Sequence, residues 1–113
     1  MNSSLAENRT ISIISYNIKY DNKLDKINTW EARRNDLLNI FKDNEPSFIG
    51  IQEGLQHQVD YIKLNLPNYD YIGSGRDDGK TKGEFCAIYY DSSEYNLLKQ
   101  STFWLSSNPL EVS

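Results

Sequence analysis

The sequence contains little of several residue types that define particular classes of protein. It has one cysteine (Cys86), one histidine (His57), three prolines, and no apolar run near the ~20 residues that a membrane span needs. A single cysteine cannot form an internal disulfide, which excludes a disulfide-stabilised scaffold. Positive charge is also scarce, because 12 Lys and Arg against 16 Asp and Glu give a net charge of −4. This balance argues against nucleic-acid binding by bulk charge alone.

At 113 residues the chain is long enough for one domain at most, since ~100–150 residues is the commonest domain size. No repeat, low-complexity tract or linker divides it. We expect residues 1–9 to form an N-terminal extension and the folded part to begin at residue 10. The first residues have neither the basic start nor the apolar stretch of a secretory signal. A cytoplasmic protein is therefore expected, or one whose leader has been removed.

Hydrophobic patterning predicts an α/β chain with strands of mixed direction, in the order β-α-β-α-β-β-β. Strands rich in β-branched or apolar residues are expected at 10–18, 47–52, 69–74 and 84–90, with weaker strand candidates at 95–102 and 103–105. Asn28 or Thr29 can cap the first helix, which carries an apolar stripe at helical spacing from Trp30 to Phe41. The second helix carries Leu55, Val59, Ile62 and Leu66 and ends at Pro67.

Two polar side chains stand at the ends of the first two predicted strands. Glu53 follows a short apolar strand and Asn17 ends the first strand. Ligands gather at the carboxyl ends of strands in α/β sheets, and a carboxylate there can bind Mg²⁺, which prefers oxygen ligands. The alternatives are a solvated Glu53 that caps the next helix and an Asn17 that bonds its own backbone. His57, four residues after Glu53, is expected on the surface or in support of the site.

A loop that follows the third predicted strand, from Gly73 to Gly83, mixes glycines with basic residues. Glycine permits close approach of the backbone to an anion, and Arg76 could hold a phosphate by a bidentate contact. A mobile hairpin loop with solvated charges is the alternative. In the next strand, Cys86 stands among apolar residues and is expected in the core, where cysteine behaves as a small hydrophobe.

Taken in order, these motifs resemble the endonuclease/exonuclease/phosphatase superfamily, and in particular its bacterial branch related to deadenylase-type exonucleases. Each motif is weak by itself, whereas the ordered set is specific. The matching stretches are Ser15–Asp21, Trp30–Arg33, Phe48–Gly54, His57–Gln58, Leu66–Tyr69, Gly73–Gly79, Gly83–Phe85 and Thr102–Ser106.

The resemblance implies a four-layer α/β sandwich and a hydrolase of phosphodiester or phosphomonoester bonds that depends on Mg²⁺ or Mn²⁺. By this likeness Glu53 would be a metal ligand, and Asn17 would help to hold both the metal and the scissile phosphate. Arg76 would bind the phosphate, and His57 and Glu84 would line or brace the site. The metal would polarise the phosphate and offset the charge that develops on it.

The chain departs from the superfamily pattern in what it lacks. Superfamily members typically have about twice this length, and their later part supplies an Asp-x-Asn motif and an Asp-His pair, neither of which occurs here. We therefore expect residues 10–113 to be the N-terminal part of a single domain, without a complete catalytic set and without activity of their own.

Several functions are compatible with this sequence. The first expectation is a nuclease of 3'-5' exonuclease type with nucleic acid as partner. A sphingomyelinase or an inositol-phosphate phosphatase is the alternative within the superfamily, and a non-catalytic α/β interaction module is the alternative outside it.

Overall fold

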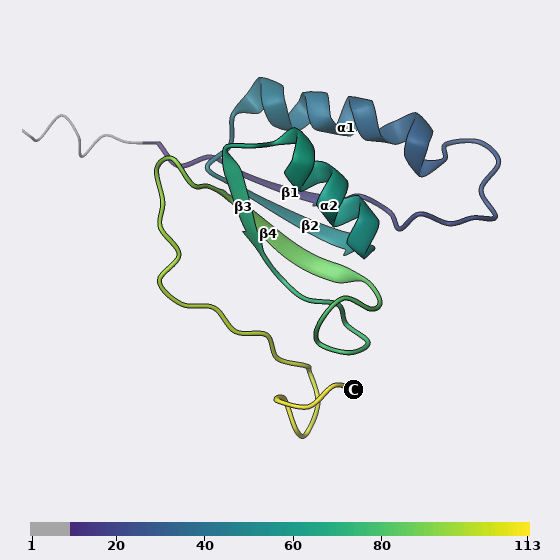
Figure 1. Ribbon diagram of the computed structural model, residues 1–113, viewed down its shortest axis with the longest axis vertical. Coiled ribbons are helices and arrows are strands. Elements are labelled where there is room, and N and C mark those ends of the chain that lie inside the picture. The colour runs from purple at the N-terminus through teal and green to yellow at the C-terminus, as the bar shows by residue number, and fades with distance from the viewer. Residues whose placement is uncertain (1–9) are drawn as a thin grey trace, which may run out of the picture.

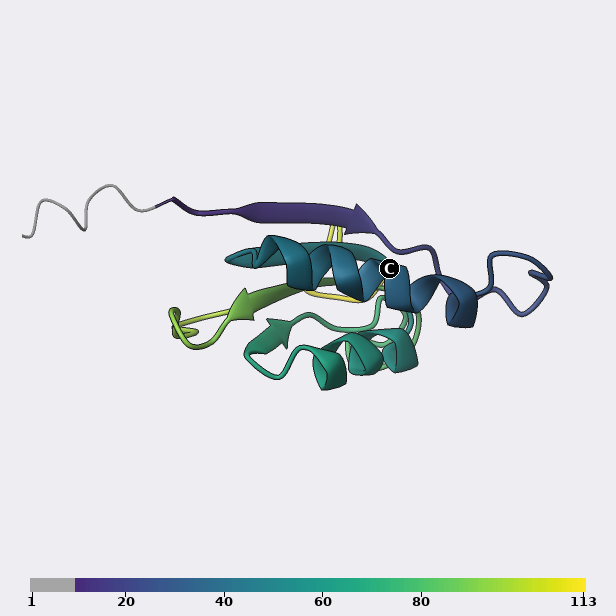
Figure 2. The ribbon, with the colours of Figure 1, turned by 90° about the horizontal axis from the view of Figure 1, so that it is seen from above.

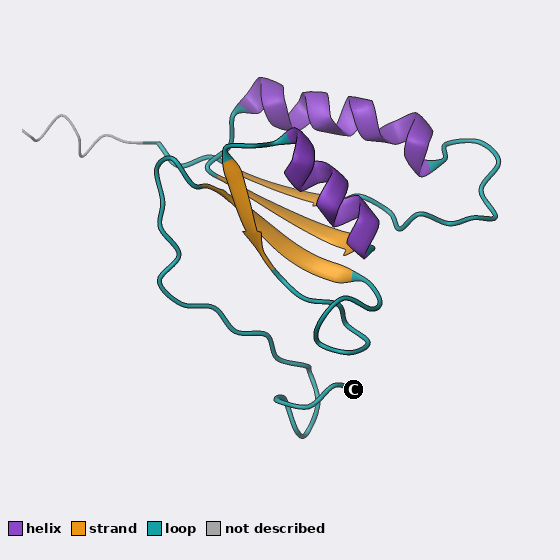
Figure 3. Cartoon of the chain, in the orientation of Figure 1, coloured by secondary structure: helices purple, strands orange, loops and turns teal. Residues whose placement is uncertain are grey.

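A computed structural model describes residues 10–113 and shows a four-stranded sheet with two helices packed against it (Figures 1 and 3). The predicted extension at residues 1–9 lies outside the described residues. The elements are β1 (Ile13–Asn17), α1 (Trp30–Asn44), β2 (Phe48–Gly54), α2 (Gln56–Asn65), β3 (Tyr69–Ile72) and β4 (Phe85–Asp91). The α/β class is confirmed, and the described residues supply one sheet and one helical layer.

The strands lie in the order β1-β2-β4-β3 and run in mixed directions, as predicted. β1 and β2 are parallel and are joined through α1, whereas β4 is antiparallel to both β2 and β3. Figure 2 looks onto the helices and shows the four strands side by side, from the purple β1 at one edge to β3 at the other. Because β1 and β2 are parallel, their carboxyl ends meet at one edge of the sheet, with Asn17 opposite Gln52.

Both helices begin and end where the sequence predicts. Thr29 caps α1, because its hydroxyl oxygen accepts a hydrogen bond from the backbone N–H of Ala32 at 3.2 Å. Leu55 and Leu66 flank α2 as its cap residues. The core between the helices and the sheet consists of Ile18, Trp30, Leu37, Leu38, Phe41, Ile49, Ile51, Val59, Ile62, Leu66, Phe85, Ala87 and Tyr89. The apolar stripes predicted on both helices therefore face the sheet.

The prediction of further strands at 95–102 and 103–105 is wrong. These residues form irregular chain that runs from the end of β4 to the loop between β3 and β4 (Figure 1). β-propensity alone does not make a strand, because each strand needs a neighbouring backbone to bond. Leu98 and Leu105 are almost fully exposed, so burial does not hold this segment in a strand either.

The sheet face opposite the helices is apolar and largely uncovered within residues 10–113. We call it the open sheet face; its apolar residues are Ile13, Phe48, Ile72, Ile88 and Tyr90. Tyr95, which follows β4, contacts one end of it, with its ring 4.8 Å from that of Phe48. Alternation along β4 also places Cys86 on this side, exposed, so the prediction of a buried Cys86 is wrong.

Neither of the two helices found within residues 10–113 has the length and apolar content required to cross a membrane.

Candidate functional site

Asn17 and Glu53 meet at the carboxyl ends of β1 and β2. The Asn17 amide donates a hydrogen bond from Nδ2 to Glu53 Oε1 at 3.1 Å, and its Oδ1 accepts one from the backbone N–H of Lys19 at 2.9 Å. The backbone N–H of Tyr20 donates to Glu53 Oε2 at 3.4 Å. Both oxygens of the Glu53 carboxylate thus have a donor beside them, and these contacts fix how the carboxylate is aimed.

The backbone of Glu53 is unusual. Its φ is +64°, in the left-handed region that non-glycine residues rarely enter, and the pairing of β2 with β4 is irregular between Ile51 and Gly54. Such a conformation costs of order 1–3 kcal/mol and persists only where the surrounding structure imposes it. Here it turns the carboxylate away from the path that a regular strand would give it, toward Asn17.

A cavity of about 600 Å³ opens beside this pair. Four of the side chains predicted for the site line it: Asn17, Glu53, Arg76 and Glu84. Cys86, on the open sheet face, lines it as well, and Phe103 and Trp104 form an aromatic wall. The structure therefore brings together residues from β1, β2, the loop before β4 and the segment after β4.

Arg76 lies on a loop that several hydrogen bonds cross, and its side chain is exposed. The backbone N–H of Arg76 donates to Glu84 O at 3.0 Å, and the carbonyl of Arg76 accepts from Trp104 Nε1 at 3.0 Å. Asp78 Oδ1 accepts from two backbone N–H groups across the loop. At Gly75 a Cβ atom would stand 2.3 Å from the Lys82 carbonyl oxygen, so the loop closes only with glycine there.

His57 is placed apart from the cavity lining. Its Nε2 lies 2.8 Å from Asp21 Oδ2, and Lys23 Nζ donates to the same oxygen at 2.9 Å. Asp21 is buried although its partners are exposed. The hydrogen bond from Lys23, followed by that from His57, lowers the pKa of Asp21 despite the opposing effect of burial. His57 therefore contacts the loop after β1, and its supporting role stays a prediction.

Sequence reasoning missed four contributors to this region: the side chains of Asp21 and Gln58 and the backbone N–H groups of Lys19 and Tyr20. Asp21 and Gln58 lie inside stretches that match the superfamily, which is the signal that could have singled them out. Backbone donors carry no residue-type signal, because every residue except proline supplies one.

The oxygen donors around the cavity offer a divalent cation few protein ligands. Within residues 10–113 no three His, Cys, Asp or Glu side chains gather into a metal-binding group. Mg²⁺ often takes only one or two protein carboxylates and completes its shell with water and phosphate oxygens. Glu53 and Glu84 line the same cavity, so the carboxylate oxygens that such an ion needs are present there. Asn17 presents its NH₂ group to Glu53, and this orientation suits a residue that aims the carboxylate.

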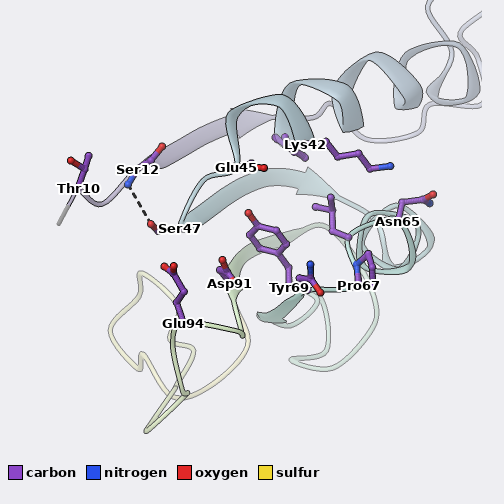
Figure 4. A pocket seen from close by; sticks show the side chains of 13 residues that line it. Thr10, Ser12, Lys42, Glu45, Ser47, Asn65, Pro67, Tyr69, Asp91 and Glu94 are labelled. Atoms are coloured by element: carbon purple, nitrogen blue, oxygen red, sulfur yellow. Dashed lines mark hydrogen bonds between the residues drawn. The ribbon is translucent and has the colours of Figure 1, made fainter. Parts of the chain in front are cut away.

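A second cavity, of about 550 Å³, lies at the opposite edge of the sheet, near the amino ends of β1 and β2 (Figure 4). Three carboxylates, those of Glu45, Asp91 and Glu94, line it together with Tyr69 and one cation, Lys42. Burial, followed by these carboxylates, raises the pKa of the Tyr69 hydroxyl. Negative potential of this kind repels a phosphate, so this cavity is the weaker candidate for a phosphate-ester site.

Solved structures of similar proteins share the fold. A Bacteroides vulgatus protein described as endonuclease/exonuclease/phosphatase is 41% identical, with a TM-score of 0.88 over 92% of this chain and 40% of its own. The mannosyl-6-phosphatase Bt3783 of Bacteroides thetaiotaomicron is 36% identical, with a TM-score of 0.88 and the same coverage. TDP2 of D. rerio, solved with a single-strand DNA product, is 26% identical, with a TM-score of 0.58 over 74% of this chain and 30% of its own.

No protein-family model matches the sequence, and no relative is found among curated proteins. The structures nevertheless define the class: the sheet and its helices are those of an endonuclease/exonuclease/phosphatase fold. The chain belongs to the endonuclease/exonuclease/phosphatase family, and it spans about 40% of the length of the two Bacteroides proteins. This confirms the resemblance found in the sequence at the level of the family.

Proposed function

We propose that the protein to which these residues belong is a metal-dependent phosphoesterase. The observation that carries the proposal is the aimed Glu53 carboxylate, held by Asn17 and Tyr20 beside a cavity that Arg76 also lines. Two phosphate-ester chemistries occur among the similar proteins, since one is named a phosphatase and another was solved with DNA. These names support a hydrolase of phosphate esters.

The residues of the cavity have separable roles in this proposal. Glu53 and Glu84 would hold a Mg²⁺ or Mn²⁺ ion, which when bound would polarise the phosphate. Arg76 would hold the phosphate oxygens by charge-assisted hydrogen bonds. Asn17 would keep the Glu53 carboxylate aimed and would itself contact the phosphate. The group that activates the attacking water is not among these residues.

A phosphorylated sugar is the substrate class that we favour. The 36% identity to a mannosyl-6-phosphatase supports it, and so does charge, because this chain carries −4 and Arg76 is the one cationic side chain along the cavity within residues 10–113. Nucleic acid, the first expectation from the sequence, is kept as the second candidate because of the 26% identity to TDP2. Binding a polynucleotide generally needs a row of cationic contacts, one for each phosphate neutralised.

The substitution Glu53→Gln tests the proposal in the full-length protein. Gln keeps the size of the side chain but removes the charge that would hold a cation, so Mg²⁺-dependent release of phosphate should fall by at least about 100-fold. It also loses one of the two accepting oxygens, but both hydrogen bonds of Glu53 are exposed, so the unfolding midpoint should change little.

The matched control is Glu45→Gln, which also changes a glutamate with positive φ but lies at the opposite edge of the sheet. It should leave turnover unchanged. Full turnover in Glu53→Gln would remove Glu53 from the site and with it the metal site proposed here.

A substrate comparison separates the two candidates. The full-length protein is assayed with Mg²⁺ or Mn²⁺ on mannose 6-phosphate, on an inositol phosphate, on sphingomyelin and on single-stranded RNA and DNA. Faster release from the sugar phosphate is the expected result. Stepwise shortening of the polynucleotide from its 3' end, with no release from the sugar, would favour the exonuclease instead.

A further inference from the structure

Gln58 is a polar side chain that the fold buries completely, although it lies on α2 and outside the lining of the candidate cavity. Burying an amide costs free energy unless its polar atoms are bonded. Its Oε1 accepts from the backbone N–H of Leu55 at 3.0 Å, which is the helix-capping contact expected at this position. Capping accounts for that one bond only.

The other two bonds of Gln58 reach across the molecule to the segment that follows β1. Oε1 also accepts from the backbone N–H of Asp21 at 3.0 Å, and Nε2 donates to the carbonyl of Lys19 at 3.1 Å. Lys19 has a φ of +58°, so the chain reverses there in a conformation that needs outside support. Gln58 supplies that support from α2.

Arg33 holds the same segment from the other side. From α1 its Nη1 donates to Ile18 O at 2.5 Å, its Nη2 to Lys19 O at 3.2 Å and its Nε to Asn28 O at 2.9 Å. A planar guanidinium with fixed donors suits such a multiple contact better than an ammonium group does. Segment 18–21 is thus tied to both helices through side chains that touch only its backbone.

The backbone of this same segment donates hydrogen bonds to the two site residues Asn17 and Glu53. The N–H of Lys19 donates to Asn17 Oδ1 and the N–H of Tyr20 to Glu53 Oε2, while Asn17 itself donates to Glu53. A shift of segment 18–21 would therefore move the Tyr20 N–H away from Glu53 and would also remove the Lys19 N–H that orients the Asn17 amide.

We propose that Gln58 and Arg33 are positioning residues, which fix segment 18–21 so that its N–H groups aim Asn17 and Glu53 into the cavity. The kinetic part of this inference rests on the proposed function; the structural part does not. The effect passes from Gln58 or Arg33 through the backbone of Lys19 and Tyr20 to the carboxylate, so neither residue needs to touch substrate or metal.

The first test replaces Gln58 with Met in the full-length protein, which keeps the size of the side chain and removes its bonds. Hydrogen exchange at the amides of Lys19 and Tyr20 should become roughly tenfold faster, because the segment opens more often. The kcat for the phosphate ester should fall by roughly 10- to 100-fold with little change in KM, because a misaimed group weakens the reaction more than binding.

Gln56→Met is the matched control, since Gln56 lies on the same helix and its amide bonds only Asp60 at the surface. It should change neither exchange nor kcat. A folded Gln58→Met protein with unchanged exchange at Lys19 and Tyr20 would overturn the proposal. Exchange is measured without substrate, so this outcome is distinct from failure of the phosphoesterase proposal, which Glu53→Gln decides.

A second pair of variants keeps the test decisive if Gln58→Met does not fold. Arg33→Lys retains the positive charge but loses the fixed set of donors to segment 18–21, and should again speed exchange at Lys19 and Tyr20 and lower kcat. Arg34→Lys is its control, because Arg34 instead lies over the ring of Tyr61 at 4.3 Å. Equal exchange in Arg33→Lys and Arg34→Lys would count against a positioning role.

Discussion

At the scale of the residue, Glu53 combines an aimed carboxylate with a backbone conformation that its side chain disfavours. A non-glycine residue in the left-handed region costs roughly 1–2 kcal/mol. Its side chain is held from β1 by Asn17 and from segment 18–21 by the backbone N–H of Tyr20. A position that is unfavourable for folding and well placed for binding is typical of functional sites.

The positive φ of Glu53 predicts that Glu53→Gly and Glu53→Ala, which both remove the carboxylate, have the reverse of the usual order of stability. In a regular strand Ala is more stable than Gly by roughly 0.5–1 kcal/mol. At Glu53, with φ of +64°, Gly should instead be more stable than Ala by about 1 kcal/mol, because only glycine adopts this φ without a steric penalty. Urea unfolding of Glu53→Gly and Glu53→Ala measures the difference, and an Ala variant as stable as the Gly variant would show that no strain is stored there.

At the scale of the element, the loop between β1 and α1 is as important to the site as the strands. Asp21 is its buried anchor: its side chain is 4% exposed, and Lys23 and His57 both bond Oδ2. The loop is thereby connected to the N-terminal turn of α2, where His57 lies. A buried carboxylate with two such partners stabilises the fold only while it is ionised.

Acid should therefore weaken this anchor. The hydrogen bond from Lys23 lowers the pKa of Asp21 in the folded chain below its ordinary value of 3.8. A lowered folded pKa means that the stabilisation is complete above the unfolded value and is lost as the pH falls through the folded one. The loss of unfolding free energy in Asp21→Asn should thus be constant between about pH 7 and pH 5 and shrink toward about pH 3.

Urea unfolding across this pH range measures the effect. Asp70→Asn is the control, because the carboxylate of Asp70 is half exposed and its nearest cation, Lys63, lies 3.6 Å away. A difference between Asp21→Asn and the unchanged protein that stays the same at low pH would contradict the account.

The elements themselves were largely predictable from the sequence. Helical spacing and caps such as Thr29 are local signals, and four of the predicted strands exist within residues 10–113. The segment after β4 was predicted wrongly because a strand depends on a partner that may be far away in sequence. Cys86 was misplaced for a related reason. Alternation along β4 shows which residues share a face of the sheet, but it does not show which of the two faces is covered.

For the site, strand ends and a glycine-rich loop pointed to Asn17, Glu53 and Arg76, and the match to a family added Glu84. The structure places all four around one cavity. Their roles stay predictions. The contacts that aim Glu53 were not predictable, because they come from backbone N–H groups and from a left-handed turn at Lys19. Such features depend on tertiary packing and leave little trace in residue type.

At the scale of the whole molecule, the open sheet face decides whether these residues are stable and monomeric by themselves. Ile13 is 70% exposed and Ile88 46% exposed, on the face opposite the helices. Contiguous apolar surface of this kind usually marks an interface. Because the chain spans about 40% of the two Bacteroides proteins, we propose that further residues of the same domain cover this face in the full-length protein.

The proposal predicts a clear contrast between two forms of the protein. Residues 1–113 produced alone should bind the dye ANS and self-associate at micromolar concentration, because the open sheet face is apolar and, within residues 10–113, largely uncovered. The full-length protein should do neither. Ile88→Ser should reduce dye binding by residues 1–113, since Ile88 lies on that face in β4, which is an inner strand of the sheet. Fluorescence titration and analytical ultracentrifugation measure both effects. A monomeric 113-residue chain that unfolds cooperatively and binds no dye would contradict the proposal and favour the non-catalytic interaction module, because such a chain would be a complete folding unit without the rest of the domain.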